Sequence, residues 1–215
     1  MEIIHFPHPA LRFQSVDVQR IDSSLRKTIQ RMFELMYEAN GIGLAANQVG
    51  LPFRFFIVNL AARADEPDEE LVFINPVIRK RRGSVVGEEG CLSLPGLYGD
   101  VTRSEQVTIE AFDLSGQGFS MDLSELPSRV VQHESDHLDG VMFTDRMREE
   151  ANSEDVDLIL PEFEANFRDA QQAGHFQSDQ ELEKNLKEMA AGGGVPSGYV
   201  DTSVYRMTPP KLDTE

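Results

Sequence analysis

The first apolar pattern along the chain predicts an amphipathic helix. Its apolar residues recur at intervals of three and four, a spacing that brings them to one face of a helix. These residues are Leu25, Ile29, Met32, Phe33 and Met36. Asp22 and Ser23 before the pattern are favourable N-cap residues, and Gly41 after it is typical of a helix end. We therefore expect a helix of about four turns.

Apolar–polar alternation further along the chain predicts strands, two of which form a β-hairpin. Pro76 interrupts one strand and lacks an N–H for the ladder, so we expect a bent or an edge strand there. The basic run 79–82 is expected to form a solvated turn, and 115–118 is the expected hairpin turn. The expected strands cover residues 54–60, 71–78, 84–87, 106–113, 119–123 and 141–143.

A second helix is predicted between Ser124, a favourable N-cap residue, and Gly140, typical of the position just after a helix. Pro127 falls in its first turn, where a missing N–H costs little. Apolar residues at helical spacing predict a further helix over 156–173. Strands in two groups, with helices before and after them, favour an α+β fold over an alternating βαβ fold.

The expected organisation is one domain with an appendage. Residues 1–150 contain all the expected strands and should form the domain that carries the chemistry. Residues 151–174 should form a C-terminal helix. Residues 175–215 are mostly polar, with a weak helical pattern over 181–191, and we expect an acidic, flexible tail there.

Charge and composition exclude several classes of protein. The 215 residues include 37 acidic and 20 basic side chains, and the net charge of −17 argues against direct binding to nucleic acid. No apolar run approaches the roughly 18 residues of a membrane span, and no signal peptide is recognisable. The single cysteine, Cys91, allows no internal disulfide. We therefore expect a soluble, cytoplasmic protein with no membrane partner.

The stretch from Gln132 to His137 is the strongest candidate for chemistry. His133 and His137 are four residues apart on the expected helix, so they share one face and can bind one metal ion. Glu134 lies between them, where its carboxylate can handle a proton of a water bound to that ion. The apolar turn before the motif indicates a buried face. The bare pattern also occurs on surface helices whose histidines are unrelated.

Two histidines need a third protein ligand to form a stable catalytic site. The metzincin continuation, in which a further histidine follows a glycine, is missing after Gly140. The candidate third ligand is therefore Cys91, which lies in a Gly-Cys-Leu-Ser segment. One thiolate and two imidazoles suit Zn²⁺, Fe²⁺, Co²⁺ or Ni²⁺, so the donor set does not choose among these ions.

Three separated segments together resemble the signature motifs of the peptide deformylase family, in the family's order. They are Gly-Ile-Gly-Leu-Ala-Ala-Asn-Gln at 41–48, Glu-Gly-Cys-Leu-Ser at 89–93 and Gln-His-Glu-Ser-Asp-His at 132–137. The segment 8–12 is also similar to the family's opening. The resemblance covers residues 4–147 and does not include 174–215.

The resemblance implies a fold, a reaction and a cofactor. The fold is α+β, with antiparallel sheets packed around the helix that carries the histidines. The reaction removes the formyl group from the N-terminal formyl-methionine of newly synthesised polypeptides, which are the implied partners. The cofactor is one divalent metal ion, with Fe²⁺ as the native ion and Zn²⁺ or Ni²⁺ often found after purification.

The resemblance also implies roles for individual residues. The implied metal ligands are Cys91, His133 and His137; the implied catalytic acid/base is Glu134; the implied donors to the carbonyl oxygen are Gln48 and the backbone N–H of Leu92; Gly43 would contact the substrate. Ile42, Leu126 and Val130 are candidate apolar walls for the methionine side chain, although each is equally typical of a plain core. Asp136 is a candidate for orienting an imidazole or Arg103.

Two features depart from the family's pattern. After Pro95-Gly96-Leu97 the family commonly has arginine, whereas this chain has Tyr98, which puts its grip on the substrate backbone in question. Some members dock on the ribosome through a basic C-terminal helix. Residues 151–215 contain 13 acidic and five basic residues, a net charge of −8, so we expect at most transient proximity to the ribosome.

Two alternatives to a peptide deformylase remain at this point. One is a related protein that has lost catalysis and binds N-terminal peptides, against which stands the presence of every implied catalytic residue. The other is a general metalloprotease with the same histidine motif, against which stands the missing downstream ligand.

Overall fold

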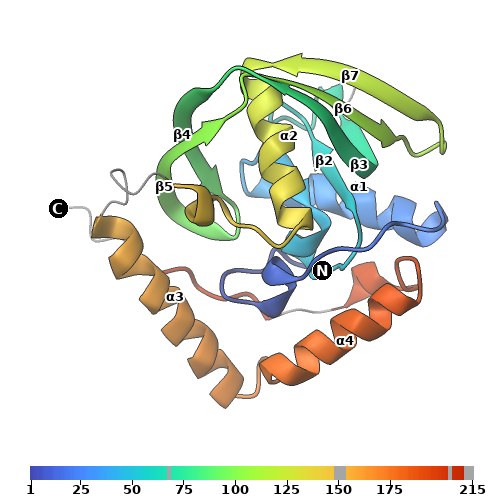
Figure 1. Ribbon diagram of the computed structural model, residues 1–215. Helices are drawn as coiled ribbons and strands as arrows, with labels where there is room; N and C mark the ends of the chain where they lie inside the picture. Colours follow the sequence, from blue (N-terminus) through green and yellow to red (C-terminus); the bar gives the residue numbers. More distant parts are fainter. Residues whose placement is uncertain (67–68, 148–153, 203–204, 211–215) are drawn as a thin grey trace.

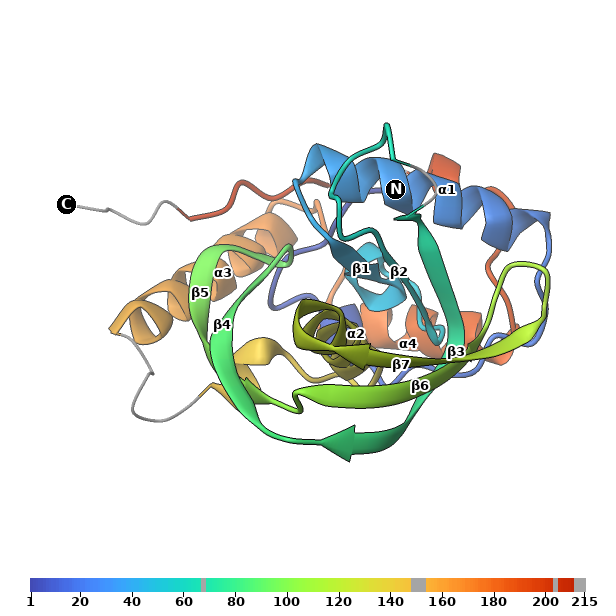
Figure 2. The ribbon, with the colours of Figure 1, turned by 90° about the horizontal axis from the view of Figure 1, so that it is seen from above.

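A single helix, α2 (Glu125–Leu138), lies inside a curved layer of strands in the computed structural model (Figures 1 and 2). The structure describes residues 1–66, 69–147, 154–202 and 205–210. The other α-helices of the described residues are α1 (Ser23–Glu38), α3 (Glu154–Gln172) and α4 (Asp179–Ala191). The expected α+β class, with antiparallel sheets around a central helix, is confirmed.

Antiparallel strands form two sheets around α2. The larger sheet has five strands in the order β1-β2-β3-β6-β7, and the smaller is the pair β4-β5. The strands are β1 (Gly43–Ala45), β2 (Phe55–Val58), β3 (Leu71–Arg82), β4 (Val85–Cys91), β5 (Leu94–Arg103), β6 (Gln106–Phe112) and β7 (Gly118–Ser124). The expected hairpin is confirmed, because β6 and β7 pair in register from Gln106 opposite Ser124 to Phe112 opposite Gly118. β1 and β5 were not expected as strands.

β3 corrects two expectations. It is an interior strand, paired with β2 on one side and β6 on the other, so the expectation of an edge position was wrong. The bend was expected correctly: the register of β3 against β6 shifts between Ile74 and Val77, which places Pro76 at an irregularity where it owes no ladder hydrogen bond. The basic run 79–82 continues the strand instead of turning, since its backbone pairs with β6.

The expected last strand over 141–143 is absent, and a 3₁₀ turn, η4 (Phe143–Arg146), begins at the last of these residues. A side-chain hydrogen bond explains the turn, because the Asp145 carboxylate accepts from the Met142 N–H at 2.8 Å. Asp145 also forms an ion pair with Arg12, near the start of the chain. Local side-chain bonding of this kind competes with strand pairing.

α1 forms as its pattern predicts. The Asp22 carboxylate accepts a hydrogen bond from the Leu25 N–H at 3.0 Å and so caps the helix. Its apolar face, including Ile29 and Met32, is buried in a core that also contains Leu44 of β1 and Phe55 of β2. α1 therefore braces the segment that follows it, which carries the first of the three motifs.

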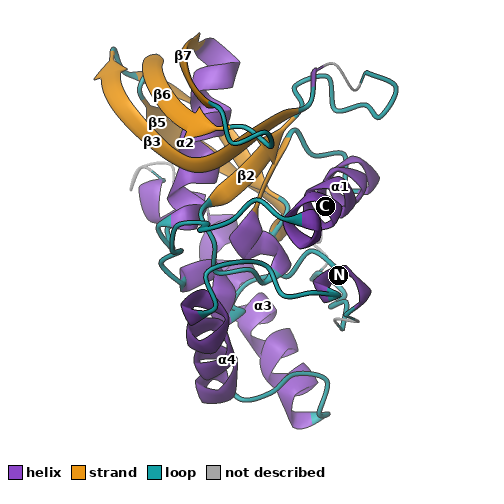
Figure 3. Cartoon of the chain, turned by 90° about the vertical axis from the view of Figure 1, so that its right-hand side faces the viewer, coloured by secondary structure: helices purple, strands orange, loops and turns teal. Residues whose placement is uncertain are grey.

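The C-terminal part of the chain packs on the end of the domain opposite the large sheet, where α3 and α4 lie (Figure 3). Phe163 of α3 and Leu186 of α4 are buried in one core cluster with Leu11. The segment expected as a flexible tail, 175–215, thus contains a helix with a buried side chain. The expected domain boundaries at 150 and 174 stay predictions; residues 148–153 lie outside the described residues.

None of the helices in the described ranges combines the length and apolar character that a membrane crossing requires.

Buried His8 should make the fold sensitive to acid. Burial lowers the pKa of His8 from 6.5 to about 4, although Asp179 acts in the opposite direction. Below pH 6.5 the unfolded chain therefore binds more protons than the folded protein. The free energy of unfolding falls as the pH falls towards 4. We expect the free energy of unfolding to lose about 3 kcal/mol from this group between pH 7 and pH 4, measured by urea titration.

His8→Asn is the matched control for this prediction. The Nδ1 atom of His8 accepts a hydrogen bond from the Ala10 N–H at 3.1 Å, and an asparagine oxygen can replace it as acceptor. Between pH 7 and pH 4, the free energy of unfolding of the variant should therefore fall by about 3 kcal/mol less than that of the wild type. Equal pH dependence of the two proteins would contradict the assignment.

Candidate metal centre and catalytic site

α2 brings His133, Glu134 and His137 into the centre of the molecule. The helix follows Ser124 as expected, although the Ser124 side chain makes no capping hydrogen bond. It ends before Gly140, whose φ of +73° suits glycine at this position. Glu134 and His137 are 4% and 1% exposed. The chemistry-bearing face of the helix thus points into the protein, as the apolar turn before the motif indicates.

Cys91 reaches the same point from the end of β4. It is the last residue of the strand, and Leu92 and Ser93 form the turn into β5. Its Sγ atom lies 3.3 Å from Nε2 of His137. Cys91, His133 and His137 offer three ligand atoms that all lie within 4.8 Å of one another. Three donors that converge in this way, one sulfur and two imidazoles, suit a divalent transition-metal ion.

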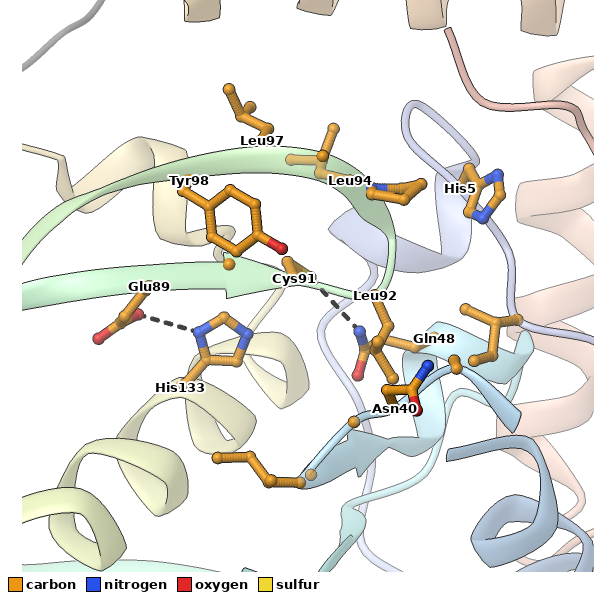
Figure 4. A pocket seen from close by; sticks show the side chains of 18 of the residues that line it. His5, Asn40, Gln48, Glu89, Cys91, Leu92, Leu94, Leu97, Tyr98 and His133 are labelled. Carbon is orange, nitrogen blue, oxygen red and sulfur yellow. Dashed lines mark hydrogen bonds and ion pairs between the residues drawn. The ribbon is translucent and has the colours of Figure 1, made fainter. Parts of the chain in front are cut away.

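The surroundings of the two histidines also fit a metal ion. Nδ1 of His133 lies 3.0 Å from a carboxylate oxygen of Glu89 (Figure 4), which fixes that nitrogen as a donor and leaves Nε2 for a ligand. Burial opposes a charge on His133, but Cys91 and Glu89 outweigh it and raise the pKa of His133 to about 10. The surroundings of this imidazole therefore favour a positive charge. Burial and the charge of His133 lower the pKa of His137, which keeps it in the neutral form that binds metals.

A buried network of charges holds Glu89 in place. Arg103 donates two hydrogen bonds to its carboxylate, at 2.8 and 2.9 Å, and Arg129 donates a third at 2.7 Å. Burial opposes the charge on Glu89, but Arg103 and His133 outweigh it and hold its pKa well below the usual range. Asp136 in turn pairs with Arg103 and Arg146. The expectation that Asp136 orients Arg103 thus agrees with the geometry.

Glu134 is buried beside Gly43 of β1. Burial, the largest influence, raises the pKa of Glu134 to about 7. Its Oε2 atom has no hydrogen-bond partner among the described residues. A Cβ atom at Gly43 would lie 2.5 Å from Oε1 and 3.0 Å from the carboxylate carbon. Glycine at this position therefore leaves the room that the carboxylate occupies.

Gln48 has its amide group fixed in one orientation. Its Oε1 atom accepts the Ala45 N–H at 2.9 Å, and only an oxygen can accept this bond. The NH₂ group must then point the other way, towards Cys91 Sγ at 3.4 Å and Ser93 Oγ at 3.3 Å (Figure 4). A preorganised N–H donor thus lies next to Cys91, one of the candidate metal ligands.

Gln48, Cys91, His133 and Glu134 line one cavity of about 720 Å³. Every residue expected to contact the substrate lines it: Ile42, Gly43, Leu126 and Val130. Val130 is buried, whereas Leu126 is 51% exposed and lies nearer the rim. The cavity is also lined by Leu92 and by Tyr98, which is 60% exposed. The cavity is large enough for an amino-acid side chain and adjoining backbone.

Two features of the site were missed in the sequence. Glu89 belongs to the second motif, but its contact with His133 was not foreseen; a carboxylate two residues before a candidate ligand was the available signal. The other is the C-terminal segment, since Arg206, Met207 and Pro209 also line the cavity. No local pattern in 205–210 indicates that position.

Comparisons with known proteins agree on one family. The model of the polypeptide deformylase family matches residues 1–153. A peptide deformylase of Rhodopirellula baltica is 43% identical over 201 residues, which are 92% of this chain and 99% of that protein. A crystal structure of Arabidopsis thaliana peptide deformylase 1B is similar with a TM-score of 0.71 and 41% identity, over 81% of this chain and 94% of that one. A Plasmodium falciparum peptide deformylase structure has a TM-score of 0.72 at 35% identity, over 80% and 98%.

Proposed function

Because the chain belongs to the peptide deformylase family, we propose that it removes the formyl group from N-terminal formyl-methionine at the site described above. One observation carries the proposal: the ligand atoms of Cys91, His133 and His137 lie together, beside a cavity that Cys91, His133, Glu134 and Gln48 line. The substrate is the formyl-methionyl end of a newly synthesised polypeptide.

Cys91, His133 and His137 would hold the one divalent metal ion of the site. When bound, the ion supplies Lewis-acid chemistry, polarising a carbonyl oxygen and lowering the pKa of water. We propose Fe²⁺ as the native ion, with Zn²⁺, Ni²⁺ or Co²⁺ as ions that the same donors accept. Glu89 would keep His133 in the ligating tautomer through its contact with Nδ1.

Glu134 would move the proton. Its carboxylate takes a proton from the attacking water while the new bond to the formyl carbon forms. It then returns that proton to the amide nitrogen as the carbon–nitrogen bond breaks, so that the peptide leaves as an amine and formate remains. A pKa raised to about 7 by burial suits a group that must both accept and donate a proton near neutral pH.

Gln48 and Leu92 would stabilise the negative charge that develops on the formyl oxygen. The Gln48 amide is held with its N–H groups towards Cys91 before any substrate binds, so no reorganisation is required. The backbone N–H of Leu92 follows Cys91 directly, in the turn at the end of β4. We propose that these two donors share the developing charge.

The substrate side chain would be recognised by apolar walls, because a formyl group is too small to confer selectivity. Ile42, Val130 and Leu126 line the cavity and are suited to contact the methionine side chain. We further propose a cytoplasmic location and transient proximity to the ribosome. We also propose that the protein does not bind nucleic acid, which the net charge of −17 supports. A relative from Arabidopsis thaliana, 38% identical, is named chloroplastic/mitochondrial.

Gly43→Ala should impair catalysis by displacing Glu134. The added Cβ would meet Oε1 at 2.5 Å, and the buried side chain has little room to move away. We expect kcat to fall about 10²-fold, since a misplacement of about 1 Å can have that effect. Steady-state formate release is the measurement. Gly118→Ala in β7 is the matched control, because its Cβ would meet nothing closer than 3.6 Å; equal rates in both variants would contradict the role of Gly43.

A comparison of three peptides tests the proposed reaction. The metal-loaded protein should release formate from formyl-Met-Ala-Ser, leave acetyl-Met-Ala-Ser intact and leave an internally quenched peptide uncleaved. Cleavage of the quenched peptide would support a general protease. Binding of the formyl peptide without any formate would support an inactive peptide-binding protein.

A further inference from the structure

The C-terminal segment 205–210 forms part of the wall of the catalytic cavity. Arg206, Met207 and Pro209 line the same cavity as Cys91 and His133. Met207 is only 6% exposed, so this wall is packed against the protein and does not simply cross its surface. Figure 2 shows the red C-terminal stretch on the side of the molecule where α1 and α3 lie.

Contacts before and at this segment hold it in place. The Gly193 carbonyl accepts the Gln19 N–H at 3.1 Å, and the Tyr199 hydroxyl donates to the Val49 carbonyl at 2.7 Å. Val49 follows Gln48 directly, so the chain is tied to the turn that carries the proposed oxyanion donor. The ring of Tyr205 stacks on His175, with centroids 4.0 Å apart and planes 4° from parallel. The residue before Arg206 is therefore held in place by this stacking.

The charges around the cavity single out Arg206. Two arginines, Arg129 and Arg206, are among the residues that line it. Arg129 is engaged with Glu89 at 2.7 Å and with the Val101 carbonyl at 3.0 Å. Arg206 is exposed and forms no ion pair with another described residue. The charge of Arg206 acts on another residue that lines the cavity: together with burial, the larger influence, it lowers the pKa of His5 to about 4.

We propose that Arg206 binds the part of the nascent chain that follows the formyl-methionine and makes the enzyme favour an acidic side chain there. Glu2, Glu38 and Glu88 also line the cavity and disfavour an acidic peptide, whereas an arginine fork is suited to a carboxylate. His5 stays neutral at pH 7 and adds no charge. The proposal rests on the proposed deformylase function, and it makes Arg206 a specificity-determining residue that takes no part in the chemistry.

The test measures preference between charged peptides. Formyl-Met-Asp-Ala and formyl-Met-Ala-Asp are compared with their lysine counterparts, all as C-terminal amides, so that only one side chain differs in charge. In Arg206→Glu, the ratio of kcat/KM for aspartate over lysine should fall about five- to tenfold at one position or both. The change should lie in KM, with kcat retained. Arg206→Gln should fall between this variant and the wild type.

Lys27→Glu is the matched control, because Lys27 is exposed on α1, changes the net charge by the same amount and does not line the cavity. Its ratio should equal that of the wild type. An unchanged ratio in both Arg206 variants, or an equal change in Lys27→Glu, would overturn the proposal. Anisotropy of the same peptides, labelled at their far ends, gives the ratio as binding constants. If the wild type releases no formate, that result counts against the proposed function. The binding constants then still test the role of Arg206.

Discussion

Glu134→Gln should keep its metal ion and lose most of its turnover. The amide has the shape of the carboxylate but cannot take up the proton of the attacking water. Positioned acid/base groups contribute about 10²–10⁴-fold to rates, and we expect kcat to fall within that range. The ligands Cys91, His133 and His137 are untouched, so metal content should match the wild type. The measurement pairs formate release with elemental analysis of the same sample.

Glu88→Gln is the matched control, since Glu88 is an exposed carboxylate that lines the same cavity. It should retain the wild-type kcat. A Glu134→Gln protein that works at a near-normal rate would show that another group moves the proton.

Cys91→Ala should lose affinity for the metal ion itself. Two imidazoles remain, and two histidines alone do not make a stable site. Because loss of residues that only orient ligands already costs about 10–100-fold in metal affinity, we expect loss of a ligand to cost at least about 10²-fold. Competition with a chelator of known affinity measures the change. Activity at limiting metal should fall with occupancy, unlike the loss in Glu134→Gln.

Ser135→Ala serves as the control for this variant, because Ser135 lies on α2 beside Glu134 and its hydroxyl bonds only to the Val131 carbonyl of its own helix. It should bind metal as the wild type does. Unchanged affinity in Cys91→Ala would remove Cys91 from the ligand set and leave the third ligand to be found.

The parts of the fold that follow from local periodicity could be predicted. α1 has an apolar stripe at helical spacing, α2 has recognisable end residues, and the β6–β7 hairpin alternates on both sides of a glycine turn. β1 has three residues, too few for a periodic signal. The extension of β3 through its basic run depends on pairing with β6, which composition cannot reveal. The strand expected over 141–143 was displaced by the hydrogen bond from Met142 to Asp145.

The candidate site shows the same division. Its three metal-binding candidates were recognisable because each stands in a motif, and the structure brings them within 4.8 Å of one another. The closeness of Gly43 to Glu134 depends on how β1 packs against α2, which no local pattern encodes. Glu89 acts through its distance to His133, 44 positions away. Arg206 reaches the cavity only because the whole C-terminal segment returns to it.

Formate release by the wild-type protein, prepared without oxygen and loaded with Fe²⁺, is the most direct test of the central claim. With formyl-Met-Ala-Ser as substrate, we expect one formate for each new amino terminus, loss of this activity after chelation, and recovery when the ion is restored. Absence of formate from the fully loaded protein, or release that persists after the metal has been removed, would contradict the account of a metal-dependent deformylase.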